Sequence, residues 1–205
     1  EDMTDDVLDI MSHYDNICNA VHFPLQAGSS RILNRMNRTY TKDHFIERAH
    51  RIREILPNCG LSTDIIVGFP GETNSEFEET LDVMNEIKFD SAFTFKYSPR
   101  LGTKAHEYSD QLSEMDKQER LDKVIKLQKK HTIFRNKDMI GSVERVLVEK
   151  DSKRSNNQWA GRTDSNKWVI FDKENENIKD IVDVLITDAK GISLHGHLVK
   201  KKEAA

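Results

Sequence analysis

Apolar positions in the front part of the chain alternate between helical and strand spacing. Apolar residues three and four positions apart predict helices near 4–14, 31–36, 41–56 and 73–87. Short apolar runs predict strands at 18–23, 62–69 and 91–97. This β-α-β-α-β order is typical of a parallel sheet, whose sites lie at the carboxyl ends of the strands. We therefore expect the chemistry in the loops after Phe23, Phe69 and Tyr97.

The pattern changes in the last third of the chain. A long helix is expected at 116–139, and its predicted buried stripe is Leu121, Val124, Ile125 and Ile133. After Gly141, period-two alternation predicts short strands at 143–147, 159–163, 167–171, 181–187 and 192–199. Turn residues separate these runs, so we expect a small antiparallel β-barrel of about sixty residues.

The predicted parallel sheet is too small to form an independent core. Three parallel strands need cover on both faces, and their edges would stay open. The chain also starts at Glu1, close to a predicted helix. We expect the chain to be the C-terminal piece of a longer protein whose earlier strands complete a barrel.

The segment STDIIVGFPGETNSEFEETL (62–81) places a glycine loop between a strand and a helix. Such a loop can bind phosphate through free N–H groups at the helix start. However, Gly68 and Gly71 do not have the G-x-G-x-x-G spacing of a dinucleotide-binding loop. Thr73 and Glu76 form a T-x-x-E pattern, which predicts a capping box that occupies those N–H groups. We therefore expect the loop to serve a ligand other than a polyphosphate.

Composition narrows the class of protein. Hydrophobic residues at 37% and charged residues at 32% fit a water-soluble protein, and no apolar run approaches a membrane span, so we expect a cytoplasmic protein. The net charge of −4 means that any RNA contact must come from a local basic patch. Cys18 and Cys59 do not have the spacing of a disulfide framework or a metal site.

Three loop segments and the tail together resemble one family. HFPLQAGSSRILNRMNR (22–38), the glycine-loop segment (62–81) and FDSAFTFKYSPRLGTKA (89–105) resemble the methylthiotransferases, which are radical S-adenosylmethionine (SAM) enzymes. GSVERVLVEK and WAGRTDSNKWVIF in the tail resemble the TRAM domain that ends those enzymes. The resemblance implies an α/β fold, the C-terminal part of a radical SAM (β/α) partial barrel, at 1–137. It also implies a small all-β TRAM barrel that binds RNA at 138–200, and a tail at 201–205.

Within the family, DSAFTFKYSPRLGTKA is most similar to the branch that acts on tRNA. That branch converts N6-isopentenyladenosine next to the anticodon to its 2-methylthio form. The nearest alternative is the branch that modifies an aspartate of a ribosomal protein. The resemblance implies the anticodon stem-loop of tRNA and the missing N-terminal part of the same protein as partners, no membrane, and a monomeric full-length enzyme.

The resemblance implies SAM as cofactor and two [4Fe–4S] clusters in the full-length protein. Neither of the family's cysteine sets is present in this chain, because Cys18 and Cys59 stand alone. A cluster needs several thiolates placed close together. We therefore expect no cluster and no metal in this chain, and no activity of this piece alone. The resemblance assigns no catalytic residue to it.

The resemblance also implies candidate ligand residues at the strand ends. The SAM candidates are Gln26, Ser29, Asp64, Ile66 and Gly68. The substrate or RNA candidates are Tyr97, Arg100, Arg162 and Lys167. The second strand departs from the superfamily's G-x-I-x-G-x-x-E pattern, because Asp64 replaces the first glycine and Gly71 replaces the glutamate, with Glu72 one position later.

Several of these residues have a plain structural alternative. Arg162 and Lys167 could contact phosphates or could be ordinary surface charges. Trp159 and Trp168 could stack on bases or fill the core of the barrel. Two other interpretations of the whole chain are an RNA-binding module on an α/β scaffold and an unrelated α/β enzyme with a barrel tail.

Overall fold

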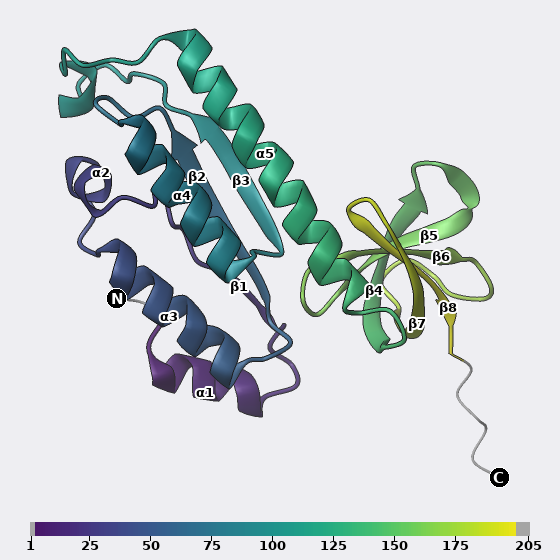
Figure 1. Ribbon diagram of the computed structural model, residues 1–205. Coiled ribbons are helices and arrows are strands. Elements are labelled where there is room, and N and C mark those ends of the chain that lie inside the picture. The colour runs from purple at the N-terminus through teal and green to yellow at the C-terminus, as the bar shows by residue number, and fades with distance from the viewer. Residues whose placement is uncertain (1–2, 200–205) are drawn as a thin grey trace. The chain divides into compact units, whose positions relative to one another are not determined.

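The computed structural model describes residues 3–199, and the chain divides into two compact units (Figure 1). The sheet unit takes Val21–Pro57 and Leu61–His131. The barrel unit takes Glu1–Ala20, Asn58–Gly60 and Thr132–Ala205. The predicted tail at 201–205 lies outside the described residues. No helix in residues 3–199 is long and apolar enough to cross a bilayer.

The sheet unit follows the predicted alternation of strands and helices. Its strands are β1 (Ala20–His22), β2 (Gly60–Val67) and β3 (Ser91–Lys96), in the order β1-β2-β3. Its helices are α2 (Ser30–Arg35), α3 (Lys42–Ile55), α4 (Asn74–Ile87), the 3-10 helix η1 (Lys104–His106) and most of α5 (Glu114–Lys137). β2 and β3 pair in parallel, as expected. β1 is shorter than the predicted strand at 18–23.

Side chains cap the N-termini of α3 and α4. The Thr41 side chain accepts a hydrogen bond from His44 N at the start of α3. The predicted capping box of α4 is confirmed, because Thr73 and Glu76 bond to each other's backbone N–H groups. Each cap satisfies helix donors that would otherwise lack partners and contributes about 1 kcal/mol.

The two faces of the sheet differ in cover. On one face of β2, Leu61, Thr63, Ile65 and Val67 are all buried. On the other face Ser62, Asp64 and Ile66 are partly exposed, and the register places them beside Ser91, Phe93 and Phe95 of β3. Phe93 is 59% exposed and Phe95 is 51% exposed, so this second face, the open face, lacks the cover that a parallel sheet needs. Figure 1 shows α3 and α4 lying beside each other along the sheet.

The prediction for the buried stripe of α5 is partly wrong. Val124 is buried, but Ile125 is 48% exposed. The helix instead buries polar side chains, which are Lys117, Arg120, Gln128, His131 and Asn136. These side chains find specific partners; for example, Gln128 Nε2 donates to Phe89 O at 2.9 Å. Hydrophobic spacing alone misses this face because its anchors are hydrogen bonds.

The barrel unit contains a short helix and a closed barrel. The helix is α1 (Asp5–His13), and the strands are β4 (Val143–Ser152), β5 (Ser155–Thr163), β6 (Trp168–Asp172), β7 (Ile181–Lys190) and β8 (Ser193–Leu198). The strands close in the order β4-β5-β6-β8-β7. The expected barrel is confirmed, but the expectation that it is purely antiparallel is wrong, because β6 and β8 pair in parallel. Closure removes the open edges that a small sheet would otherwise expose.

The core of the barrel comes from alternate residues of its strands. It contains Val146, Val148, Val169, Phe171, Val184, Ile186 and Leu194. Trp159 packs against this cluster, so one of the two tryptophans serves the barrel core.

Candidate functional site

A cavity lies at the carboxyl ends of the three parallel strands, within the sheet unit. Its volume is about 1090 Å³, and the three loops that the sequence singled out, together with the end of α2, line it. Asp64, Ile66 and Phe95 reach it from the open face of the sheet. Strand ends of this kind are where α/β proteins bind ligands.

Gln26 enters this cavity from a strained position after β1. Its φ of 66° lies in the left-handed region of backbone conformations, which residues other than glycine rarely adopt. Its N–H donates to Asp64 O at 2.8 Å, and its carbonyl accepts from Ile66 N at 2.8 Å. These two bonds to β2 hold the strained backbone and fix where the side chain of Gln26 starts. Such strain is commonly found at ligand sites.

The structure brings together five of the seven candidates in the sheet unit. Gln26, Asp64, Ile66, Tyr97 and Arg100 all line the cavity. Ser29 and Gly68 do not line it, and their polar groups bond inside the protein.

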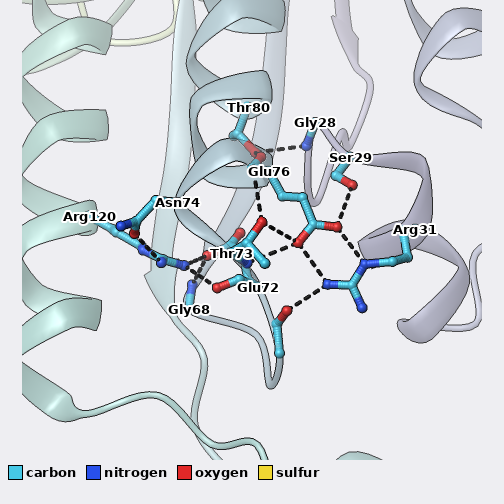
Figure 2. A network of polar contacts seen from close by, with 11 residues as sticks. Gly28, Ser29, Arg31, Gly68, Glu72, Thr73, Asn74, Glu76, Thr80 and Arg120 are labelled. Carbon is cyan, nitrogen blue, oxygen red and sulfur yellow. Dashed lines mark hydrogen bonds and ion pairs between the residues drawn. The ribbon is translucent and has the colours of Figure 1, made fainter.

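Glu76 is the centre of a polar network that joins α4 to the loop before α2 (Figure 2). Its carboxylate accepts from Arg31 Nε at 2.6 Å, from Thr73 N at 2.9 Å and from Ser29 Oγ at 3.2 Å. One helical turn further, Thr80 Oγ1 accepts from Gly28 N at 2.9 Å. The hydrogen bonds from Arg31 contribute most to lowering the pKa of Glu76 to about 2.

A second, buried network fixes the glycine loop after β2 (Figure 2). Glu72 accepts from Gly68 N at 2.7 Å and pairs with Arg120 of α5. Arg120 also donates to Glu72 O at 3.0 Å and to Asn74 Oδ1 at 2.9 Å. The side chains of Glu72 and Arg120 are 1% and 8% exposed, and burial raises the pKa of Glu72 against the lowering by Gly68 and Arg120.

These networks occupy two of the N–H donors of the glycine loop. Gly68 N donates to Glu72 and Thr73 N donates to Glu76, so neither of these two donors is available to a phosphate. The loop instead presents Phe69 to the cavity, where its ring meets Tyr97 edge-on at a centroid distance of 5.0 Å.

Tyr97 is poised at the wall of the cavity. Its hydroxyl oxygen is buried and has no hydrogen-bond partner among residues 3–199. Burial is the main cause of its raised pKa. A buried hydroxyl without a hydrogen-bond partner destabilises the folded protein. The position of Tyr97 therefore favours a ligand, or another part of the protein, that hydrogen-bonds to this hydroxyl.

The barrel candidates are engaged within their own unit. Arg162 donates to Asn166 Oδ1, lies 3.4 Å from Glu149, and stacks over the Trp168 ring at 4.4 Å. Lys167 Nζ donates to Asn136 Oδ1 at 3.2 Å.

The residues of this chain do not fit an iron–sulfur cluster. Cys18 is exposed and Cys59 is buried, and both are free thiols. Among residues 3–199, no three His, Cys, Asp or Glu side chains gather as a metal site would require.

The sequence interpretation did not single out Arg31, Arg38, Lys104 and Arg120. Arg120 could have been found from the polar positions 117, 120, 128 and 131, which recur at helical spacing and predict a buried polar face of α5. Arg38 and Lys104 lie in the quoted loop segments, but no local pattern distinguishes them from surface charges.

Two family models match separate parts of the chain. Residues 1–84 match the family model of the radical SAM superfamily, and residues 137–199 match that of the TRAM domain. A tRNA-2-methylthio-N(6)-dimethylallyladenosine synthase from Christiangramia forsetii is 42% identical over 96% of this chain and 41% of its own length. The synthases of that name from Clostridium tetani and Carboxydothermus hydrogenoformans are 43% and 42% identical over 97% of this chain, and 44% and 45% of their own length.

The resemblance to the methylthiotransferases is confirmed. It concerns the C-terminal part of those proteins, and the chain spans about two fifths of the length of the curated relatives it matches. Coproporphyrinogen III oxidase from Escherichia coli, described as a radical SAM enzyme, matches with a TM-score of 0.53 at 16% identity, over 80% of this chain and 44% of that chain. At this identity the likeness concerns the fold alone. The expected fold class, a partial radical SAM barrel followed by a TRAM barrel, is confirmed.

Proposed function

We propose that this chain is the C-terminal part of an enzyme that adds a methylthio group to C2 of N6-isopentenyladenosine next to the anticodon of tRNA. The observation that carries the proposal is the strand-end cavity, with Gln26, Asp64 and Ile66 gathered in it, in a chain whose relatives bear the name of that synthase. We assign 1–137 to the radical SAM domain and 138–200 to the TRAM domain, in a cytoplasmic and monomeric full-length enzyme.

The cavity residues fit SAM. Gln26 and Asp64 offer hydrogen bonds to ribose or amino-acid groups, and Ile66 and Phe69 offer apolar surface to an adenine ring. When bound, SAM would supply radical chemistry at C2 of the substrate base, with the electron for its reductive cleavage coming from a cluster that the missing part of the protein would hold. The protein's part is to orient the reactants and to exclude water. Ser29 and Gly68 would act indirectly, because their hydrogen bonds hold the loops that line the cavity.

The exposure of the open face of the sheet indicates that another part of the protein covers it. Phe93 and Phe95 are more than half exposed, and Phe93 contacts the ring of His22 edge-on at 5.9 Å. We propose that the N-terminal part of the same protein covers this face and brings the cluster cysteines that this chain lacks. This piece alone would then be inactive.

Nucleoside analysis of tRNA tests the proposed function. A strain without the full gene should accumulate N6-isopentenyladenosine and lose its 2-methylthio form, and the restored gene should reverse both changes. Mass spectrometry of digested tRNA measures the two nucleosides. An unchanged nucleoside profile after deletion would overturn the proposal.

For the barrel, we predict that Arg162→Ala weakens tRNA binding and lowers the slope of log K against log salt by about 1, the value for one lost phosphate contact. Fluorescence anisotropy at several salt concentrations measures both quantities. Arg162 also bonds to Asn166 at the turn between β5 and β6, so a thermal melt of the variant serves as the control for folding. Unchanged binding across the salt range would remove Arg162 from the RNA surface.

A further inference from the structure

Three cationic side chains at the strand-end cavity have no hydrogen-bond or ion-pair partner among residues 3–199. The cavity is lined by five cationic side chains, Arg35, Arg38, Lys96, Arg100 and Lys104, and by one carboxylate, Asp64. Arg35 pairs with Asp110 at 2.9 Å, and Lys96 pairs with Glu114 at 3.4 Å. Within residues 3–199, no hydrogen bond or ion pair engages the side chains of Arg38, Arg100 and Lys104.

Defined turns hold the backbones of these three residues. Arg38 follows Asn37, whose φ of 59° ends α2, and Arg38 N donates to Leu33 O at 2.9 Å. The carbonyl of Arg100 accepts from Thr103 Oγ1 at 2.8 Å, in the turn that leads to Lys104 at the start of η1. The backbone of each residue is thus held in place, while its charged group stays available to a ligand. A binding site needs this arrangement.

The charge balance indicates a ligand with more than one negative group. After the pairs to Asp110 and Glu114 are set aside, three cations face the single carboxylate of Asp64. SAM carries one carboxylate and a positive sulfonium, so it cannot account for three cations. Consecutive phosphates of a nucleic-acid strand can account for three cations, because each phosphate carries a negative charge.

We propose that Arg38, Arg100 and Lys104 form a phosphate clamp, which binds the backbone of the RNA on both sides of the nucleotide that enters the cavity. This inference rests on the proposed function, because it assumes that RNA is the substrate. The clamp belongs to the sheet unit, so it adds to any RNA contact made by the TRAM domain. It positions the substrate strand and takes no part in bond making.

A matched pair of triple variants tests the clamp in the full chain. The first is Arg38→Gln, Arg100→Gln and Lys104→Gln. The control is Lys126→Gln, Lys129→Gln and Lys130→Gln, which removes the same charge from exposed positions of α5 in the same unit. Fluorescence anisotropy with an anticodon-type RNA stem-loop gives affinity and salt dependence, calorimetry with SAM gives cofactor affinity, and circular dichroism checks folding.

The expected result is specific to the clamp. Its variant should bind the stem-loop about tenfold or more weakly, with a salt slope smaller by about 2, since each single-strand phosphate contributes about 0.7. SAM binding should be unchanged, and the control should bind RNA nearly as the wild type does. Each single substitution should lower the slope by about 0.7, which keeps the test valid if the triple variant is unstable.

Four outcomes would overturn the clamp. Equal losses in the clamp variant and the control would mean that only overall charge matters. Loss of SAM binding with intact RNA binding would assign the cations to the cofactor. Failure of the wild-type chain to bind the stem-loop would remove the clamp together with RNA as the ligand, whereas RNA binding that the clamp variant retains would remove the clamp alone.

Discussion

Replacing Arg120 by alanine should lower the free energy of unfolding of the sheet unit by about 3–5 kcal/mol, the cost of leaving a buried charge unpaired. Arg120 is the guanidinium that pairs with Glu72, and both side chains are nearly inaccessible to solvent. Its loss would also remove the hydrogen bonds to Glu72 O and Asn74 Oδ1 that tie α5 to the glycine loop. Urea denaturation followed by fluorescence or circular dichroism measures the change.

The pH dependence of this variant identifies the cause. Burial already raises the pKa of Glu72, and without Arg120 that pKa should rise further. A buried carboxyl with a raised pKa destabilises the fold at high pH, because the charged form is then buried. The destabilisation disappears as the pH falls and the carboxyl is protonated. The deficit of Arg120→Ala should therefore shrink as the pH falls. A double replacement, Glu72→Leu with Arg120→Met, should cost less than either single change.

An exposed position of α5 provides the control for this prediction. Lys129→Ala, at an exposed position of α5, should change the free energy of unfolding by no more than about 0.5 kcal/mol. A deficit of Arg120→Ala that is equally small, or that is independent of pH, would show that the Glu72–Arg120 pair does not hold the glycine loop.

Acid should destabilise the sheet unit through Glu76. The pKa of this carboxyl is about 2 in the folded protein against an ordinary value of 4.5, and each unit of lowering corresponds to about 1.4 kcal/mol. Because the folded pKa is depressed, the stabilisation is fully present above pH 4.5 and is lost as the pH falls toward 2. The upper limit of the effect is about 3.5 kcal/mol.

Glu76→Gln separates the charge from the helix cap. Glutamine can still accept from Thr73 N in the capping box, but it cannot form an ion pair with Arg31. The variant should be less stable than the wild type at pH 7 and should depend less on pH between 5 and 2. Glu78→Gln, at an exposed position of the same helix, is the matched control and should retain the wild-type profile. An unaltered pH profile for Glu76→Gln would contradict the role of the pair with Arg31.

The parts of the fold that follow hydrophobic spacing could be predicted from the sequence. The order of strands and helices, the capping box of α4 and the barrel all follow from local patterns, because burial and capping act over a few residues. The parallel pairing of β6 with β8 could not be predicted, since it depends on how the barrel closes and not on any one strand.

The candidate site was predictable only in part for a similar reason. Five candidates meet in the cavity because parallel strands end at one edge of the sheet, a rule that holds for the whole fold class. Ser29 and Gly68 were placed by analogy with a ligand site, whereas their polar groups bond to Glu76 and Glu72. Contacts of this kind join segments far apart in the chain, and one sequence carries no signal for them.

The most direct test of the account is the reaction itself. The full-length protein that contains this chain, with its clusters reconstituted, should be incubated with SAM, a reductant and tRNA that bears N6-isopentenyladenosine, and the digested nucleosides should be measured by mass spectrometry. The account predicts conversion of that nucleoside to its 2-methylthio form. Unmodified tRNA, with methylthiolation of a ribosomal-protein aspartate in a parallel reaction, would contradict it.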